Sequence, residues 1–178
     1  MKRAISFIVI AFFAASVVTA QYKVRPNMPF LTFNSNPGFI TINEFTGGIG
    51  LSGKTLPYSK SFFGFTSVNG YQVNKNFILG AGTGLYFYES GLLVPLFLDF
   101  RFAFNTGQLV PYLFADGGLL LNSSNLNDTK LFINPGAGAR YTLSRNFAIN
   151  LGAGILSQVD GTARESFVNL KLGAIYKF

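Results

Sequence analysis

The sequence predicts an all-β fold, an eight-stranded antiparallel up-and-down transmembrane β-barrel preceded by a cleaved signal peptide, and three observations carry this prediction. Apolar residues alternate with small or polar ones along eight segments of about a dozen residues, close to the length of a tilted transmembrane strand. The 178 residues include 21 Phe, 8 Tyr and 20 Gly, which favour strands and turns over helices. Charged residues make up 12% of the chain, too few to cover an ordinary soluble surface.

The first 20 residues have the pattern of a secretory signal peptide. Lys2 and Arg3 give a positive start, an apolar stretch follows, and Val18-Thr19-Ala20 forms a small-residue cleavage site. A transmembrane anchor is the alternative, but the apolar run is shorter than the roughly 20 residues that a membrane-spanning helix needs. We therefore expect an exported chain.

Residues 21–38 are expected to form an extended leader in front of a single domain, residues 39–178. Pro26, Pro29 and Pro37 interrupt this stretch, and it shows no stable period. The length of the chain suits one domain better than two.

The strands are predicted from the period of two. We expect them near residues 39–52, 60–73, 76–88, 92–104, 108–122, 131–143, 147–158 and 166–178. In the fourth, Leu96, Leu98 and Phe100 oppose Phe97, Asp99 and Arg101, whereas the facing of the second stays open. Short turns near 74–76, 106–107 and 144–146 alternate with links near 53–59, 89–91, 123–130 and 159–165 that we expect to be longer, as in a membrane barrel. An even number of strands places both chain ends at the short-turn rim.

The apolar face is expected to meet lipid. A soluble, lipocalin-like barrel would place that face inside around a greasy ligand. Against this reading, the polar faces carry too little charge for water, and glycines crowd them at 80, 82, 84, 136, 138, 152 and 154. Aromatic residues also gather at strand ends, as interfacial girdles do: Phe77, Phe102, Tyr141, Phe147, Tyr176 and Phe178 at one rim, and Tyr58, Phe87 and Phe132 at the other.

The chain ends in NLKLGAIYKF, which alternates and finishes on an aromatic residue. With the signal peptide and the eight alternating segments, this ending resembles the small bacterial outer-membrane barrels of the OmpX and OmpA type. The resemblance covers residues 39–178 and implies localisation in the bacterial outer membrane. It also implies that the last strand is read by the barrel-assembly machinery through Leu170, Leu172, Ala174, Tyr176 and Phe178. Phe178 would equally serve as a girdle residue.

GIGLSGKT, residues 48–55, matches the phosphate-loop pattern G-x-x-x-x-G-K-[ST]. A phosphate loop needs a buried parallel strand before it and a helix after it. The preceding FITINEFTG contains the polar Asn43 and Glu44, and the following LPYSKSFFGFTSVNGYQV has no helical apolar stripe. We therefore interpret the match as fortuitous, a Gly-rich strand end that runs into a loop.

The inferred lumen carries a balanced set of charges: Glu44, Asp99 and Asp116 against Arg101, Arg140 and Lys171. In a narrow interior such charges are tolerable when paired, so we expect a neutralising network. With a turn at Thr106-Gly107, Asp99 would lie opposite Phe114 and diagonal to Asp116. An acid/base pair of the glycosidase kind is the catalytic alternative for these carboxylates.

The sequence contains no Cys and no His, which excludes disulfides, His-based proton shuttles and zinc sites built on these residues. We expect a non-enzymatic barrel with a plugged polar lumen and no cofactor or metal, which contributes to envelope structure or to surface interaction and adhesion through its longer loops. A small pore or lateral conduit for apolar molecules is the alternative, and a lipid-modifying barrel enzyme is a third.

The expected partners follow from the same reading. They are outer-membrane lipid and glycolipid, the barrel-assembly machinery during biogenesis, and a surface ligand held by the loops. The basic residues Lys54, Lys60, Lys130 and Arg164 would contact glycolipid phosphates or remain solvated. The net charge of +7 includes Lys2 and Arg3 of the signal peptide and is spread thinly, so nucleic acid is not an expected partner. We expect a monomer.

Overall fold

The computed structural model describes residues 31–51, 60–89, 91–123, 129–160 and 163–178. The predicted signal peptide, residues 1–20, and the first part of the leader lie outside them. Eight strands run in chain order: β1 (Gly38–Gly50), β2 (Ser61–Gln72), β3 (Phe77–Tyr88), β4 (Gly91–Ala103), β5 (Leu109–Asn122), β6 (Lys130–Thr142), β7 (Phe147–Asp160) and β8 (Ala163–Lys177). Their bounds lie within three residues of the predicted ones.

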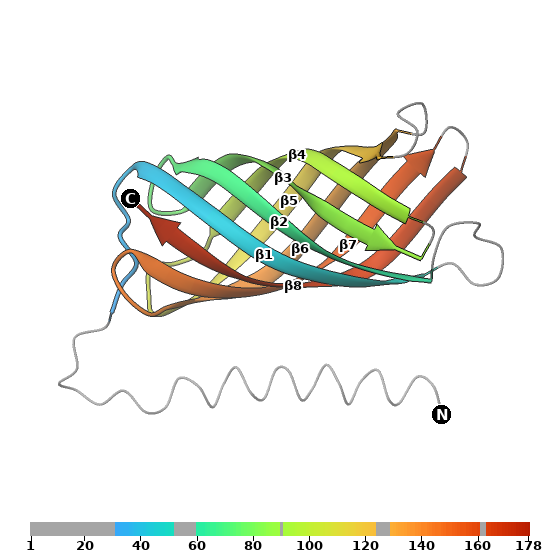
Figure 1. Ribbon diagram of the computed structural model, residues 1–178. Coiled ribbons are helices and arrows are strands. Elements are labelled where there is room, and N and C mark those ends of the chain that lie inside the picture. Colours follow the sequence, from blue (N-terminus) through green and yellow to red (C-terminus); the bar gives the residue numbers. More distant parts are fainter. Residues whose placement is uncertain (1–30, 52–59, 90, 124–128, 161–162) are drawn as a thin grey trace, which may run out of the picture. The chain divides into compact units, whose positions relative to one another are not determined.

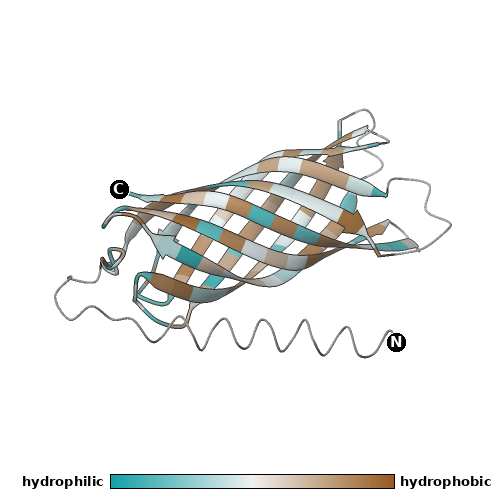
Figure 2. Ribbon diagram, turned by 90° about the horizontal axis from the view of Figure 1, so that it is seen from below, coloured by the Kyte–Doolittle hydropathy of each residue, from teal (hydrophilic) through white to brown (hydrophobic). Residues whose placement is uncertain are grey.

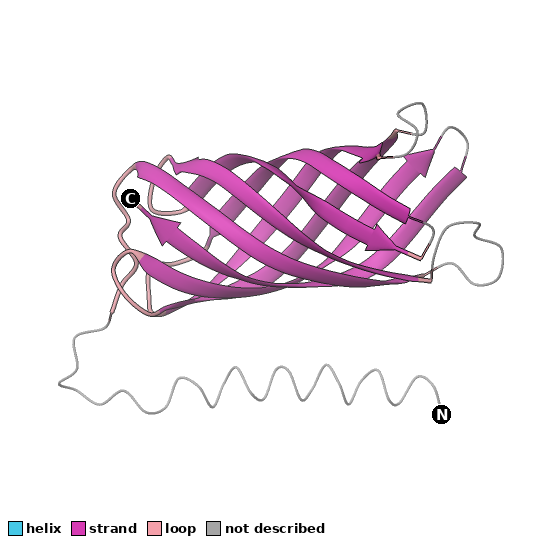
Figure 3. Ribbon diagram, viewed as in Figure 1, coloured by secondary structure: helices cyan, strands magenta, loops and turns pink. Residues whose placement is uncertain are grey.

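The strands form one closed barrel in which each is antiparallel to both neighbours (Figures 1 and 3). β8 closes on β1 along a seam that runs from Ile40 opposite Lys177 to Gly50 opposite Phe167. The start of β1 and the end of β8 lie with the turns 73–76, 104–108 and 143–146 at one end, the turn rim (Figure 1). The connections 51–60, 89–90, 123–129 and 161–162 leave from the other end, the loop rim. The predicted fold class is confirmed.

Side chains alternate between the lumen and the outer surface along every strand, and Figure 2 shows the matching alternation of hydropathy. The facing of β2, left open by the sequence, is now fixed by its pairing with β1 and β3. Phe62, Thr66 and Val68 point into the lumen and are buried, whereas Phe63 and Phe65 point outward.

The outer surface is a wide apolar band. Leu151, Leu170 and Leu172 keep about 60% of their side chains exposed, and exposed Leu, Ile, Val or Phe side chains occur on all eight strands. A soluble protein rarely exposes a contiguous apolar surface of this extent, whereas a transmembrane barrel presents one to lipid. In the part of the chain that the structure describes, no helix is long and apolar enough to span a membrane.

Two predicted links are shorter than expected. Two residues separate β3 from β4, and two separate β7 from β8, so the prediction of longer links at 89–91 and 159–165 is wrong. The ladders continue to the end of both hairpins, where Tyr88 pairs with Gly91 and Asp160 with Ala163. Gly91 has a φ of +147°, which explains the glycine at this position.

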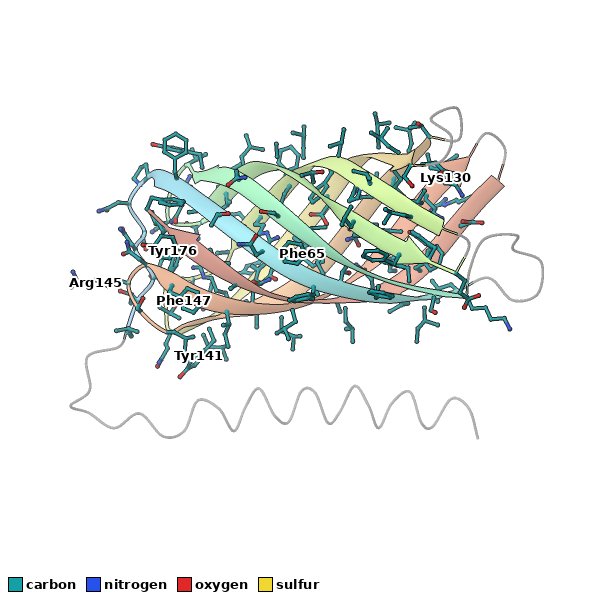
Figure 4. All side chains as sticks on the ribbon, in the orientation of Figure 1. Phe65, Lys130, Tyr141, Arg145, Phe147 and Tyr176 are labelled. Carbon is teal, nitrogen blue, oxygen red and sulfur yellow. The ribbon has the colours of Figure 1, made fainter. Side chains whose placement is uncertain are left out.

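Aromatic residues gather at the turn rim, where Tyr141, Phe147 and Tyr176 lie (Figure 4). At the loop rim the prediction fails in part. Phe132 is 3% exposed and points into the lumen, because it shares its face of β6 with Asn134. Phe87 is exposed as predicted, and Tyr58 lies outside the described residues.

Candidate functional site: the barrel lumen

Two cations link three carboxylates in the middle of the lumen. Arg101 donates through Nε and Nη2 to Asp99 at 2.8–3.1 Å and through Nη1 to Glu44 at 2.9 Å. Lys171 Nζ donates to Asp116 at 2.5 Å and to Glu44 at 3.4 Å. Each of these five side chains is at most 3% exposed, so the pairs are almost completely shielded from water.

The strand register brings these residues to one level. Asp99 on β4 lies directly opposite Asp116 on β5, and Arg101 lies opposite Phe114. The prediction that Asp99 faces Phe114 is therefore wrong. The pairing of Ala103 with Tyr112 centres the turn one residue further along the chain than Thr106-Gly107, which shifts the register by two.

Neutral polar side chains complete this group. Asn150 donates to Glu44 at 2.5 Å and to the hydroxyl oxygen of Tyr112 at 3.2 Å, and Asn134 donates to Asp116 at 3.0 Å. Both cations also face aromatic rings: Lys171 Nζ lies 4.7 Å from the ring centre of Phe114, and the Arg101 guanidinium lies 5.7 Å from that of Tyr112. We call Glu44, Asp99, Arg101, Asp116 and Lys171, with Asn134 and Asn150, the central network.

The sixth predicted lumenal charge, Arg140, lies apart from the central network. Its guanidinium carbon is 4.7 Å from the ring centre of Phe33, and it forms no ion pair with a described carboxylate. The structure thus brings five of the six predicted residues together and places Arg140 nearer the turn rim. The central network holds three carboxylates against two cations.

The leader closes the turn rim, a feature that the sequence reasoning missed. Phe33 is 3% exposed and belongs to the same buried apolar cluster as Ile40, Ile78 and Ile175. Asn34 N donates to Arg145 O at 2.8 Å. Lys177 Nζ bonds the carbonyl oxygens of Asn34, at 3.0 Å, and Asn36. One signal in the sequence could have indicated this closure. Lys177 lies on the lumenal face of the last strand, where its charged group needs a partner.

Aromatic side chains fill the loop-rim half of the lumen. The Phe62 ring centre lies 5.1–5.4 Å from those of Tyr86, Tyr88 and Phe167. Across the barrel, Phe97 and Phe132 are 6.0 Å apart. The sequence reasoning expected small and hydrogen-bonding groups here and missed these rings.

Another buried ion pair, separate from the central network, lies beside these rings. Lys130 Nζ is 3.7 Å from Glu165 Oε2, and Gln158 donates to Glu165 at 2.5 Å. The expectation that Lys130 is a solvated loop residue is therefore wrong, because it begins β6 on the lumenal face. Lys60 and Arg164 are exposed near the loop rim as expected, and Lys54 lies outside the described residues.

Glycines provide the space that the lumenal rings occupy. A Cβ on Gly48 would lie 2.2 Å from the Phe62 ring, and a Cβ on Gly136 would lie 2.3 Å from that of Phe114. Gly48 begins the phosphate-loop match, and its role in this structure is packing. β1, which ends at Gly50, is antiparallel to both neighbours, unlike the strand of a phosphate loop. Residues 52–55 of the match lie outside the described residues.

One small cavity adjoins the central network. A cavity lined by Arg101, Tyr112 and Arg140, with Ile78, Ala103 and Ile175, has a volume of about 10 Å³, the size of one water molecule. Among the described residues, no group of three or more His, Cys, Asp or Glu side chains is placed to hold a metal ion.

The predicted assembly-signal residues lie together on the outer face of β8. Leu170, Leu172, Tyr176 and Phe178 are exposed, and Ala174 on the same face is half-buried. Phe178 N also donates to Phe39 O across the seam at 3.1 Å. This face remains accessible in the closed barrel, and recognition by the assembly machinery stays a prediction.

No protein-family model and no curated protein matches the sequence. Solved structures match across most of the chain. Neisserial surface protein A (NspA) is 18% identical with a TM-score of 0.57, over 80% of this chain and 99% of that one. The outer membrane protein OprG from Pseudomonas aeruginosa is 12% identical with a TM-score of 0.53, over 82% and 98%. The chain therefore has the fold of the small eight-stranded bacterial outer-membrane β-barrels.

Proposed function

We propose that this chain is a non-enzymatic outer-membrane barrel whose lumen is closed to solutes and whose loop rim serves envelope structure or surface interaction. The observation that carries the proposal is the set of ion pairs across the middle of the lumen. Arg101 on β4 reaches Glu44 on β1, and Lys171 on β8 reaches Asp116 on β5. Two strands separate the members of each pair along the wall, so the pairs cross the interior.

Closure at both ends supports the same reading. Phe33 and the residues after it occupy the turn rim, and the rings around Phe62 occupy the loop-rim half. A solute would have to displace an aromatic layer, break buried ion pairs and then displace a second apolar layer. Buried pairs of this kind resist separation, because each freed charge would be left without water.

The same contacts argue against catalysis by the lumenal carboxylates. Glu44, Asp99 and Asp116 are each engaged by a cation, and the adjoining cavity admits no substrate. A catalytic acid or base needs access to its substrate's proton. Acyl-release assays on the purified protein test this point: turnover abolished by Asp116→Asn or Glu44→Gln would overturn the non-enzyme proposal.

The outer surface supports placement in the outer membrane, with lipid around the band and ligands at the loop rim. Lys60 and Arg164 are exposed there and suit phosphates of an outer-leaflet glycolipid. Adhesion or another surface interaction would use the same rim, because the connections 51–60 and 123–129 are the longest on the barrel.

Single-channel recording in planar bilayers tests closure. We expect no stable open channel for the mature protein. Phe33→Ala/Phe62→Ala/Arg101→Ala, which removes a ring at the turn rim, a ring in the loop-rim half and a cation of the central network, is expected to give conducting events. Arg145→Ala is the matched control, since it removes an exposed cation outside the lumen. A heat-modifiable gel shift verifies that each variant is folded. Stable conductance steps in the unaltered protein would refute the closed-lumen proposal and favour the small pore.

A further inference from the structure

The lipid-facing surface is polar in one place. On β1, β2 and β3 the outward positions between the two rims include Thr41, Asn43, Ser67, Asn69 and Thr83. Cross-strand pairing makes them contiguous: Thr41 faces Asn69, Asn43 faces Ser67, and Ser67 faces Thr83. We call these five residues the β1–β3 polar patch.

The polar patch lies within the apolar band rather than at its edge. On the turn-rim side it is bounded by the Phe39–Tyr71 pair, with ring centres 5.2 Å apart. On the loop-rim side it is bounded by Phe45 and Phe65, also 5.2 Å apart. These aromatic side chains are exposed on the outer surface, so the patch is surrounded by lipid-facing groups.

The rest of the barrel shows no comparable feature in its described strands. Between the rims, the outward positions of β4 to β8 carry apolar residues or glycine, except for Ser157 and Ser166. Those two hydroxyl groups form a hydrogen bond with each other at 3.0 Å, so neither lacks a hydrogen-bonding partner. The polarity is therefore confined to one side.

The two carboxamides of the patch have no hydrogen-bonding partner in the described part of the barrel. Thr41 Oγ1 donates to Val68 O at 3.3 Å, but among the described residues the side chains of Asn43 and Asn69 form no hydrogen bond. Both are exposed on the outer face. In hydrocarbon there is no water to satisfy them, and polar side chains in such positions mark contacts between membrane segments.

We propose that the β1–β3 polar patch is the interface of a homodimer, in which a second copy of this chain covers it around a two-fold axis. A carboxamide both donates and accepts, so the patch is complementary to itself, as an interface related by a two-fold axis requires. An apolar partner would leave the carboxamides unsatisfied, and a charged partner would bring its own charge into the bilayer. The dimer replaces the monomer expected from the sequence and does not depend on the closed lumen.

Cysteine cross-linking in outer membranes tests the proposal, because the native chain contains no Cys. Ser67→Cys places a thiol at the centre of the patch, where facing barrel walls lie about 10 Å apart. A bis-maleimide of matching length is expected to give a dimer band from Ser67→Cys. The control is Ala153→Cys, an exposed outward position on β7, which is expected to remain monomeric. Equal cross-linking of both variants would indicate random collision and overturn the proposal.

A second variant isolates the role of the carboxamides. Asn43→Leu/Asn69→Leu replaces both carboxamides with apolar side chains that are compatible with lipid. We expect this variant to remain folded, as measured by the heat-modifiable gel shift. In sedimentation equilibrium in density-matched micelles, the unaltered protein is expected at twice the chain mass and this variant at the chain mass. The Ser67→Cys dimer band is expected to disappear in the same background. A dimer that persists, a monomeric unaltered protein, or cross-linking of Ser67→Cys to a different protein alone would each refute the homodimer.

Discussion

Replacing Lys171 with methionine removes a cation that contacts carboxylates on two sides of the lumen. Lys171 Nζ lies 2.5 Å from Asp116 and 3.4 Å from Glu44, and the residue is 1% exposed. Methionine retains most of the apolar packing of the side chain. Glu44 keeps its bonds from Arg101 and Asn150, whereas Asp116 keeps a bond from Asn134. The change therefore leaves the Asp116 carboxylate buried without a cation.

The expected loss is about 3–5 kcal/mol in the free energy of unfolding, the usual cost of removing one partner from a buried ion pair. Combining Lys171→Met with Asp116→Asn removes both charges, and the loss is expected to fall to about 1–2 kcal/mol. Arg140→Met is the comparison for loss of a lumenal cation, because Arg140 faces the Phe33 ring and no described carboxylate. Its expected cost is about 1 kcal/mol.

Urea titration of the protein folded into phospholipid vesicles measures these differences. The chain contains no Trp, so far-UV circular dichroism and the unheated gel mobility are suitable readouts. Midpoints convert to free energies if the slope is unchanged between variants. The reasoning is wrong if Lys171→Met costs no more than Arg140→Met, or if adding Asp116→Asn fails to recover stability.

Three further changes test other parts of the barrel. Phe33→Ala removes the buried ring at the turn rim, and we expect it to lower the free energy of unfolding by about 3 kcal/mol in urea titration and to speed hydrogen exchange at that rim. Unchanged stability would contradict the packing role of Phe33. Gly136→Ala would place a Cβ 2.3 Å from the Phe114 ring and 2.4 Å from a backbone oxygen, so we expect it to lower the free energy of unfolding by about 1–3 kcal/mol. Gly117→Ala is the control, because its Cβ would meet no atom nearer than 3.8 Å, and we expect it to leave the urea midpoint unchanged. Phe178→Ala is expected to lower the amount of folded barrel in outer membranes while the purified protein keeps its urea midpoint; a shifted midpoint with normal assembly would make Phe178 a structural residue instead.

The fold could be predicted because it depends on a local pattern. A period of two, with lipid on one side, sets the facing of each strand without knowledge of its neighbours. The facing of β2 could not be predicted because Ser67 and Asn69 lie on its outward face beside Phe63 and Phe65, so neither face of the strand is purely apolar. Ser67 and Asn69, which made the facing of this strand ambiguous, both belong to the β1–β3 polar patch.

The lumenal contacts could be predicted in kind but not in detail. Buried charges need partners, which identified the five charged residues of the central network but also included Arg140, which lies apart from it. Their pairing depends on register, and moving the β4–β5 turn by one residue changes which side chain faces Asp99. The position of the leader could not be predicted for another reason. Phe33 lies in a stretch with no period, and its position depends on contacts with Arg140 and with residues of several strands.

The order of the charged residues along the chain gives β8 a specific role in the assembly of the barrel. Four charged residues of the central network, Glu44, Asp99, Arg101 and Asp116, precede β8, so a sheet that still lacks β8 has three carboxylates against one cation at the level of this network. Lys171 arrives with β8 and contacts Glu44 and Asp116, on β1 and β5. Closure of the final seam and partial neutralisation of these carboxylates are thus a single event, which disfavours an open, seven-stranded by-product.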